Sequence, residues 1–448
     1  MVDLQKFYQA TNPGKALEVS NPEEKKYYID FSSVRGGEII SELKDTITYF
    51  SPDNPTCVLF TGHIGCGKST ELLRLKGELE QEGFEVVYFE SSEDLEMTDV
   101  DIVDILLAIA RRVSQNLEEL TLAEPKRFKD LLHNVAKVLN AEVQGIKFKI
   151  PNVGEVGFEN KGETFTLAVG IGEITAKAKS DSMLRNKVNQ YLGPQKTDLL
   201  KAINEELLEP AIAKLKQQGK KGLVVIVDNL DRLDSRPKPF GRPQQEYLFV
   251  DQGEYLSKLH CHLVYTMPLA LKFSNDYSNL TQRFDDPKVL PMVLVKLPDG
   301  RECETGMALL RQMVLARAMP DLEPNQRLEK IEEIFDSPES LDRLCSASGG
   351  HVRDLLRLLN SWVKKGRKFP LSRQTLEEVI RERRNEMTLV ISEDEWELLR
   401  QVKQQKKVSG DQAYQILIRS RFVFEYRAEG DCWFDVNPLL AEAKELQP

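Results

Sequence analysis

No pair of cysteines in this sequence has the C-x-x-C spacing of a metal site or a redox motif. Scattered cysteines are typical of reduced thiols in a cytoplasmic protein and argue against a disulfide scaffold. No stretch approaches the ~20 apolar residues of a membrane-spanning helix, and the chain does not begin with a basic run followed by an apolar segment. We therefore expect a cytoplasmic location and no membrane contact. The cysteines are Cys57, Cys66, Cys261, Cys303, Cys345 and Cys432.

An excess of basic charge is also missing. The chain holds 61 lysines and arginines against 71 aspartates and glutamates, a formal net charge of −10. This balance argues against a surface-wide field that binds polyanions, so DNA is a possible partner only through a local basic groove. The one dense group of metal ligands is His260-Cys261-His262. Zinc needs three or four ligands and no partner pair is visible in the sequence, so a metal role is not favoured there.

The length of 448 residues predicts about two to four domains. The composition, with 41% hydrophobic and 29% charged residues, is that of a folded globular protein. Changes of pattern along the chain predict four parts. They are an N-terminal linker and lead-in helix at 1–50, a core domain at 51–298 with a β-rich insertion at about 141–180, a helical lid at 299–387 and a small domain at 388–448.

Short apolar runs alternate with helical patterns in the predicted core domain. Strands are predicted at "TCVLFT", "EVVYFE", "VVIVD", "HLVYTM" and "VLPMVLVKL" (289–297), and a helix over 68–81 follows the first strand. Strands and helices in alternation predict a parallel sheet with helices on both faces, an α/β fold. From Val143 to Ala178, apolar and polar residues alternate with intervening glycines, which predicts a β-hairpin.

The segment after the first strand fits the phosphate-binding motif G-x-x-x-x-G-K-[ST] completely, between a strand and a helix as the motif requires. Its glycines let backbone N–H groups surround a β-phosphate, Lys68 reaches the β- and γ-phosphates, and Ser69 is a magnesium ligand. Thr70 follows, in a position to face the α-phosphate. The predicted ligands are ATP or ADP and Mg2+. The motif residues are Gly62, His63, Ile64, Gly65, Cys66, Gly67, Lys68 and Ser69.

A second acidic strand accompanies this motif. Four apolar residues precede Asp228 in "VVIVDNLDRL", which predicts this carboxylate at the C-terminal edge of the sheet, where open α/β sheets bind ligands. There it is expected to hold the magnesium ion with Ser69, through water. The alternative is a strand end whose carboxylate caps a helix or forms an ion pair. The phosphate-binding motif in the same chain disfavours it.

Together these segments resemble AAA+ and STAND-type P-loop ATPases. The order of a core, a helical lid and a winged helix is similar to that of the origin-recognition initiators, and the Asp-x-x-Asp-Arg stretch is similar to KAP-type ATPases. The resemblance covers roughly residues 30 to 445 and is most specific at the P-loop and Asp228. It rests on "RGGE" (35–38), "GHIGCGKST", "VVIVDNLDRL", "LTQRF" (280–284) and "SGGHVRDLLRLL" (348–359).

The resemblance implies roles for three further residues. Thr266 takes the place of a sensor that detects the γ-phosphate or the attacking water. Arg283 takes the place of an arginine finger that reaches the nucleotide of a neighbouring subunit, which implies a homo-oligomer. Arg353, after two glycines, takes the place of a lid arginine that detects the γ-phosphate in its own subunit. Both arginines also fit ordinary surface or helix-capping positions.

Asn229 departs from the AAA+ pattern, which places a glutamate after the magnesium aspartate to take a proton from the attacking water. Asparagine can orient water but cannot accept its proton. Asp231 lies two residues further on and is the candidate substitute. We therefore expect slow hydrolysis, and a long-lived ATP state favours a switch over a motor.

The C-terminal segment predicts two helices and then two strands around Glu429-Gly430, the order of a winged helix. Such a module binds DNA in the initiators. Here it carries more acidic than basic residues, so a structural or protein-binding role is at least equally favoured. The cations available for phosphate contacts are Lys406, Lys407, Arg419, Arg421 and Arg427.

The whole sequence thus predicts an ATP-binding, slowly hydrolysing AAA+/STAND-like ATPase. It is expected to act as an oligomerising switch with a protein partner, in a regulatory, defence or DNA-transaction system. Two alternatives stay open. One is a non-hydrolysing, nucleotide-bound scaffold or adaptor in a larger complex, and the other is a small-molecule kinase on the same P-loop. No acceptor site for a kinase is evident in the sequence.

Overall fold

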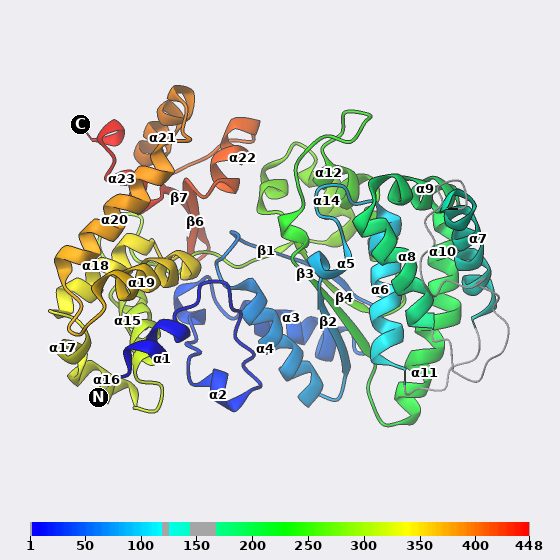
Figure 1. Ribbon diagram of the computed structural model, residues 1–448, viewed down its shortest axis with the longest axis horizontal. Coiled ribbons are helices and arrows are strands. Elements are labelled where there is room, and N and C mark those ends of the chain that lie inside the picture. Colours follow the sequence, from blue (N-terminus) through cyan, green and yellow to red (C-terminus); the bar gives the residue numbers. More distant parts are fainter. Residues whose placement is uncertain (1, 119–124, 144–166, 448) are drawn as a thin grey trace.

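Five parallel strands form the central sheet (Figure 1). The structure is a computed structural model that describes residues 2–118, 125–143 and 167–447. The strand order is β2-β3-β4-β1-β5, so β4 lies between β1, which precedes the P-loop, and β3, which ends at Asp228. Because all pairs are parallel, the strands end at one edge, and the α/β prediction is confirmed. The strands are β1 (Cys57–Thr61), β2 (Glu85–Glu90), β3 (Leu223–Asp228), β4 (His262–Met267) and β5 (Lys288–Val289).

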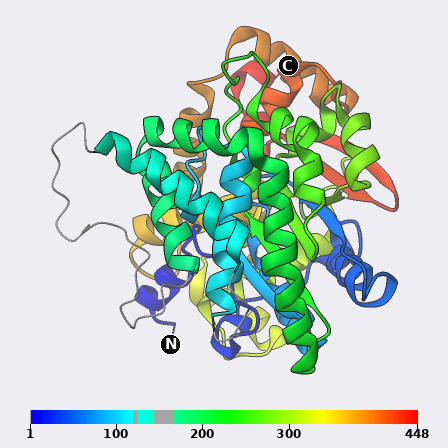
Figure 2. The ribbon, with the colours of Figure 1, turned by 90° about the vertical axis from the view of Figure 1, so that its right-hand side faces the viewer.

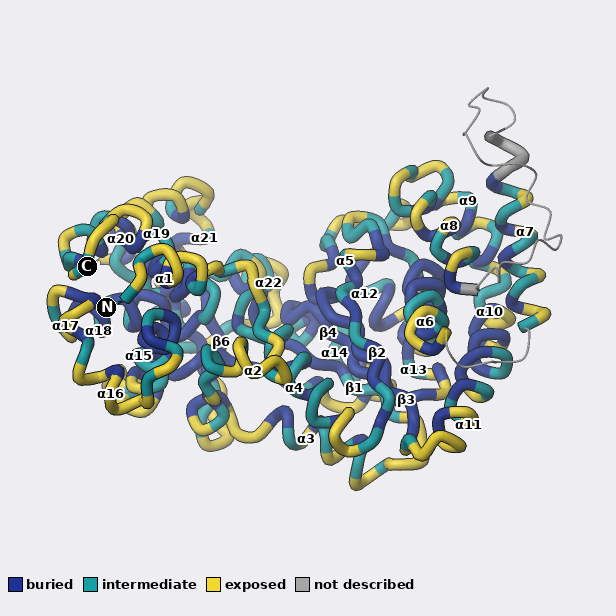
Figure 3. The backbone as a smooth tube through the Cα atoms, turned by 60° about the horizontal axis from the view of Figure 1, so that its bottom comes forward, coloured by how far each residue is buried: buried dark blue, intermediate teal, exposed yellow. Residues whose placement is uncertain are grey.

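Alternate side chains of the strands pack against two separate helical layers. On β3, Val224 and Ile226 share a core with α3 and α4, whereas Val225 and Val227 share a core with α6, α8 and α10. The strands β3 and β4 are buried along their whole length (Figure 3), and Figure 2 looks onto the second layer, in cyan and green. The helices are α3 (Ile39–Asp45), α4 (Lys68–Gln81), α6 (Ile102–Asn116), α7 (Lys126–Val143), α8 (Leu167–Ser180), α9 (Ser182–Leu192), α10 (Lys196–Ile203) and α11 (Glu209–Gln217).

The predicted β-rich insertion is wrong where the structure describes it. Residues 144–166 lie outside the described residues, but α8 is a helix and not a strand. Its buried residues Ile171, Ile174 and Ala178 recur every three or four positions, the spacing of one helical face. The two-residue alternation in "TFTLAV" and "EITAKA" is too short to distinguish a strand from such a face.

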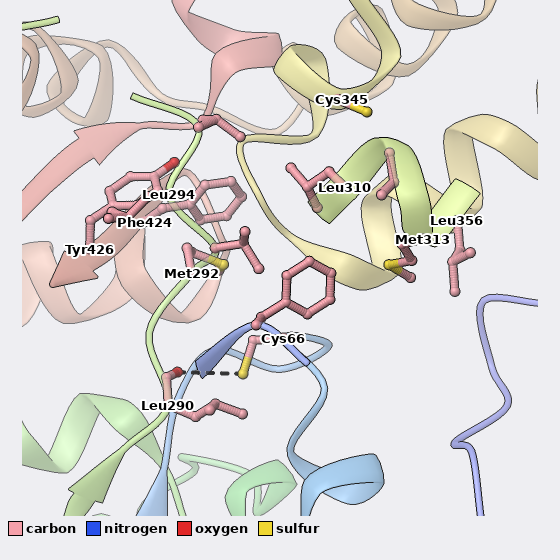
Figure 4. Packing of buried hydrophobic residues seen from close by; sticks show 14 of the residues in the cluster. Cys66, Leu290, Met292, Leu294, Leu310, Met313, Cys345, Leu356, Phe424 and Tyr426 are labelled. Carbon is pink, nitrogen blue, oxygen red and sulfur yellow. Dashed lines mark hydrogen bonds between the residues drawn. The ribbon is translucent and has the colours of Figure 1, made fainter. Parts of the chain in front are cut away.

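The last predicted strand also differs, because β5 contains only Lys288 and Val289. The apolar residues that follow, Leu290–Val295, leave the sheet and form a linking segment that is buried between the core, the helical lid and the C-terminal module (Figure 4). Leu290 keeps a hydrogen bond to Thr61 of β1 (2.7 Å), and the next backbone N–H groups bond to carbonyl oxygens of the C-terminal module, the lid and the lead-in segment. The pairs are Met292 with Glu425 (3.2 Å), Val293 with Gly350 (3.4 Å) and Leu294 with Val34 (3.2 Å).

Helices follow from Glu304 to Thr388, as predicted for the lid. The N-terminal helix α1 (Leu4–Ala10) packs on α15 and α19, so the chain starts beside the lid (Figure 1). The lid helices are α15 (Glu304–Ala318), α16 (Pro324–Glu329), α17 (Ile331–Ile334), α18 (Pro338–Ser348), α19 (Val352–Gly366) and α20 (Arg373–Thr388).

The C-terminal module has the predicted order of two helices and an antiparallel hairpin. The hairpin turns at Glu429 and Gly430, whose φ angles of 51° and 88° suit a two-residue turn. Its second helix, α22, packs against the core at the short 3-10 helix η7 (Leu269–Phe273). The elements are α21 (Glu393–Gln405), α22 (Gln412–Arg419), β6 (Val423–Ala428), β7 (Asp431–Val436) and α23 (Pro438–Ala441).

Five further short α-helices lie in the described ranges. None of the helices in the described ranges is long and apolar enough to cross a membrane. The short helices are α2 (Pro22–Lys25), α5 (Ser91–Asp94), α12 (Gln244–Glu246), α13 (Gly253–Ser257) and α14 (Tyr277–Phe284).

Candidate nucleotide site

The P-loop connects β1 to α4, which begins at Lys68. Gly65 shows why glycine is required in this loop. Its φ angle is 94°, and a Cβ atom there would lie 2.8 Å from His351 and 2.9 Å from Arg353. The loop and the first turn of α4 present free backbone N–H groups and the positive end of the helix dipole, which together suit a phosphate.

Lys68 is buried and uses all three ammonium donors within the protein. Its Nζ atom donates to the carbonyl oxygens of Gly62 (2.8 Å) and His63 (3.0 Å) and lies 2.9 Å from Asp231 Oδ2. Burial lowers the pKa of Lys68, but the combined effect of the nearby acidic groups, Asp231 foremost and then Cys66 and Asp228, raises the pKa above its ordinary value. Lys68 is therefore a cation whose donors are held by Gly62, His63 and Asp231 in this structure.

Asp228 lies at the end of β3 with three hydrogen-bond donors around it. Tyr88 Oη donates to Oδ2 (2.9 Å), the Asn229 N–H group donates to Oδ1 (2.6 Å), and the Ser69 side chain also bonds to the carboxylate. Burial and the nearby charge of Asp231 raise the pKa of Asp228 despite these bonds. A cation at this point relieves that repulsion.

These residues fit a magnesium ion. Ser69 and Asp228 offer adjacent oxygen ligands, and Mg2+ is commonly held by one or two protein oxygens with water and phosphate. The described residues contain no cluster of three or more histidines, cysteines or acids that would suit another metal. When bound, magnesium neutralises charge on the β- and γ-phosphates.

The chain turns sharply after Asp228. Asn229 has a φ angle of 65°, and Leu230–Arg232 forms a single 3-10 turn that carries Asp231 toward Lys68. Asparagine tolerates this left-handed conformation, whereas most other residues pay about 1–2 kcal/mol for it. Asp231 therefore does not share a strand face with Asn229.

Glu90 is a pocket residue that the sequence analysis missed. It ends β2 directly beside Asp228 in the parallel register, and its Oε2 atom accepts a hydrogen bond from Asn229 Nδ2 at 2.6 Å. It lines the same pocket as Ser69 and Asp228. Both strands were predicted, and neighbouring parallel strands end at one edge, so the sequence contained a signal for this carboxylate.

Five predicted site residues do not line this pocket, namely Gly62, His63 and Cys66 of the motif together with Thr266 and Arg283. Thr266 is fully buried on β4, where its Oγ1 atom donates to Val227 O at 3.4 Å. Arg283 is exposed on α14 and donates to the carbonyl oxygen of Val250. A role for Arg283 in a neighbouring subunit's site stays a prediction.

The lid reaches the P-loop through the start of α19. The Arg353 N–H group donates to Gly65 O (3.0 Å), and His351 Nε2 lies 2.9 Å from Ile64 O. The Arg353 side chain lines the pocket, where burial and the charges of neighbouring arginines lower its pKa. Arg353 therefore lies beside the P-loop, and its role as a γ-phosphate sensor stays a prediction.

The N-terminal segment also covers the pocket, which the sequence analysis did not predict. Residues 13–16 line the pocket, and Arg353 Nε donates to Pro13 O at 3.2 Å. The Leu17 N–H group donates to Thr70 Oγ1 at 3.1 Å, so this hydroxyl is engaged by the protein itself. No periodic pattern precedes the lead-in helix, so only tertiary packing reveals this contact.

The C-terminal hairpin touches the P-loop through His63. The Glu425 N–H group donates to His63 Nε2 (3.0 Å), and the buried ring of Phe424 lies between His63 and His351, with centroid distances of 5.6 and 5.5 Å. Because Nε2 accepts this hydrogen bond, His63 is neutral. Burial and the charges of His351, Lys68 and Arg421 lower the pKa of His63 well below its ordinary value.

Acidification is expected to destabilise the protein through His63. Its pKa is lower in the folded than in the unfolded chain, so the unfolded chain binds the extra proton as the pH falls below about 6.5. The lost stability approaches about 1.4 kcal/mol per pH unit. Urea denaturation on both sides of pH 6.5 measures this loss. His63→Gln should reduce it because glutamine does not titrate, while its side-chain oxygen can still accept the hydrogen bond from the Glu425 N–H group. His260→Gln, at an exposed histidine, is the control and should leave the loss unchanged.

The strand-loop-helix geometry and the acidic edge of β3 define a P-loop NTPase domain. Residues 37–237 match the profile of the KAP family P-loop domain. The resemblance drawn from the sequence is therefore confirmed for this domain. No curated protein matches the chain.

Solved structures that are similar to the whole chain include proteins named for origin recognition. The Aeropyrum pernix ORC2 protein (ADPNP–ADP complexes) shares 12% identity, with 98% of this chain and 95% of that chain covered and a TM-score of 0.42. The A. pernix ORC1 protein in complex with DNA shares 13% identity over 90% and 91%, with a TM-score of 0.36. Cdc6p from Pyrobaculum aerophilum shares 11% identity over 96% and 94%, with a TM-score of 0.35.

Proposed function

We propose that this P-loop NTPase binds ATP with magnesium, hydrolyses it slowly and changes its assembly with the bound nucleotide. One observation carries the proposal. The P-loop is hydrogen-bonded both to the lid, through His351, and to the C-terminal hairpin, through Glu425. A nucleotide that moves the P-loop must therefore disturb both modules, as a switch requires.

The departure at Asn229 supports slow turnover. Its amide group contacts Glu90 and cannot itself accept a proton. The alternative, a nucleotide-bound scaffold without hydrolysis, rests on the same residue. Release of phosphate separates these two functions.

DNA is a secondary candidate partner because several cations of the C-terminal module are already engaged. Lys406 pairs with Asp435 and Arg427 pairs with Glu425. The helix α22 is packed on η7, so binding DNA through that helix requires the module to move.

The experiment is a mass measurement by light scattering without nucleotide, with Mg·ADP and with Mg·ATP, each with and without duplex DNA. The proposal predicts a larger assembly with Mg·ATP than with Mg·ADP. An unchanged mass in every state contradicts the switch. Tight ATP binding without phosphate release supports the scaffold instead.

Arg283→Ala is expected to lose turnover in this assembly while ATP binding to each subunit is retained. An arginine finger contributes ~10³-fold or more to phosphoryl transfer, and Arg283 lies outside its own pocket. Phosphate release at protein concentrations that support assembly measures the effect. Arg301→Ala, at an exposed arginine paired with Asp299, is the control. Equal turnover of both variants contradicts the finger role.

A further inference from the structure

Two carboxylates other than Asp228 lie near the P-loop lysine, and their surroundings differ. The Asp231 side chain is 4% exposed and forms an ion pair with Lys68. Glu90 is partly exposed, and within the described part of the chain its carboxylate is bonded by Asn229 and paired with no cation. Of the two, only Glu90 could act as a base without breaking an ion pair to the P-loop lysine.

Protonation of Asp231 removes the counter-charge of a buried ammonium group. As a base, Asp231 would have to give up this ion pair, whereas Glu90 has no such pair to lose within the described residues. Asp231 lines the same pocket, but its carboxylate is held against Lys68 and its side chain is only 4% exposed. Asp231 Oδ1 is also buried without a hydrogen-bond partner, which marks a confined position.

Glu90 meets the requirements that Asp231 does not. It lines the pocket beside Ser69 and Asp228, at the edge of the sheet that faces the phosphates. Asn229 Nδ2 donates to Oε2, which fixes the carboxylate and leaves Oε1 able to accept a proton. Its partial exposure provides a route for that proton to leave.

We infer that Glu90 is the general base for ATP hydrolysis and that Asn229 is its positioning residue. This inference rests on the proposed ATPase function. A water oxygen bonds to the γ-phosphorus while the bond to the β,γ-bridging oxygen breaks, and that electron pair stays on ADP. The proton of the water passes to Glu90 Oε1 and then to solvent. The carboxylate thus comes from the strand next to β3 and not from the residue after Asp228.

The test is phosphate release at saturating Mg·ATP together with calorimetric ATP binding. Glu90→Gln keeps an acceptor for Asn229 but cannot take a proton, so turnover should fall by ~10²–10⁴ with ATP affinity unchanged. Glu90→Asp keeps a carboxylate and should retain more turnover than Glu90→Gln. Asn229→Gly suits the left-handed backbone and removes the amide, so a smaller loss is expected.

Glu93→Gln is the matched control, because Glu93 is an exposed acid on the same segment that pairs with Arg112. It should leave turnover unchanged. Wild-type turnover in Glu90→Gln, or equal turnover of Glu90→Gln and Glu90→Asp, overturns the inference. The proposal that the protein binds ATP is not affected by either result. Loss of ATP affinity in Glu90→Gln overturns the inference in favour of a binding role. If the wild type binds ATP but releases no phosphate, both the inference and the proposed hydrolysis are wrong. If the wild type does not bind ATP, the proposed function itself is wrong.

Discussion

Lys68→Ala is expected to weaken ATP binding by at least ~100-fold, about 2.7 kcal/mol of binding free energy. Lys68 begins α4 at the end of the phosphate-binding motif, and its ammonium group lies 2.8 Å from the carbonyl oxygen of Gly62. Hydrogen bonds between charged partners in a shielded site contribute ~1.5–3 kcal/mol each. Isothermal titration calorimetry with Mg·ATP measures the change.

The same substitution is expected to lower the free energy of unfolding, because Asp231 then stays buried without its counter-charge. Truncation of one partner in a buried pair costs ~3–5 kcal/mol. Asp231→Asn in the Lys68→Ala background removes the orphaned charge, so the double variant should recover stability but not ATP affinity. This recovery would show that Asp231 and Lys68 stabilise each other in the nucleotide-free protein.

Lys76→Ala is the matched control, since Lys76 lies on the same helix and forms a partly exposed pair with Glu80. Pairs of this kind contribute little, so neither affinity nor stability should change much. Unchanged ATP affinity in Lys68→Ala contradicts the assignment of Lys68 to the phosphates. If the double variant also recovers ATP affinity, the weaker binding of Lys68→Ala comes from its lower stability and not from a lost contact with the phosphates.

The sheet was predictable because its strands are short, apolar and bounded by turn residues. Strands β2 and β4 have the predicted bounds, and both faces of the sheet are covered, so continuous apolar runs such as Leu223–Val227 indicate buried strands directly. The P-loop was predictable for a different reason. Its spacing combines glycines, a lysine and a serine that few other structures require together.

The path of the linking segment Leu290–Val295 could not be predicted from its composition. Its apolar run has the composition of a central strand, but only Leu290 still bonds to a sheet neighbour, Thr61. The N–H groups that follow bond to the hairpin, the lid and the lead-in segment. Composition reports that a segment is buried and does not report which partner buries it. The hydrogen bond between Glu90 and Asn229 could not be predicted for the same reason. These residues are far apart in the chain, and the register of β2 against β3 brings them together.

Phe424→Ala is expected to uncouple the C-terminal hairpin from the nucleotide. The ring is fully buried, stacks on His351 and meets His63 edge-on, so it joins the lid and the P-loop to β6. Figure 4 shows Phe424 beside the linking segment, in the cluster that also contains Cys66 of the P-loop. Removal of a buried phenylalanine ring costs ~3–5 kcal/mol of unfolding free energy.

Phe434→Ala separates this coupling from the loss of stability. Phe434 is buried on the same hairpin but packs on Phe273 of η7, at a centroid distance of 5.5 Å, instead of on the two histidines. Both variants should lose stability. Hydrogen exchange of β6 and β7 with and without Mg·ATP should show nucleotide-dependent protection in the wild type and in Phe434→Ala but not in Phe424→Ala. If nucleotide-dependent protection of β6 and β7 persists in Phe424→Ala, Phe424 does not couple the hairpin to the nucleotide. The linking segment is then the next contact to test, because the Met292 N–H group bonds directly to Glu425 O.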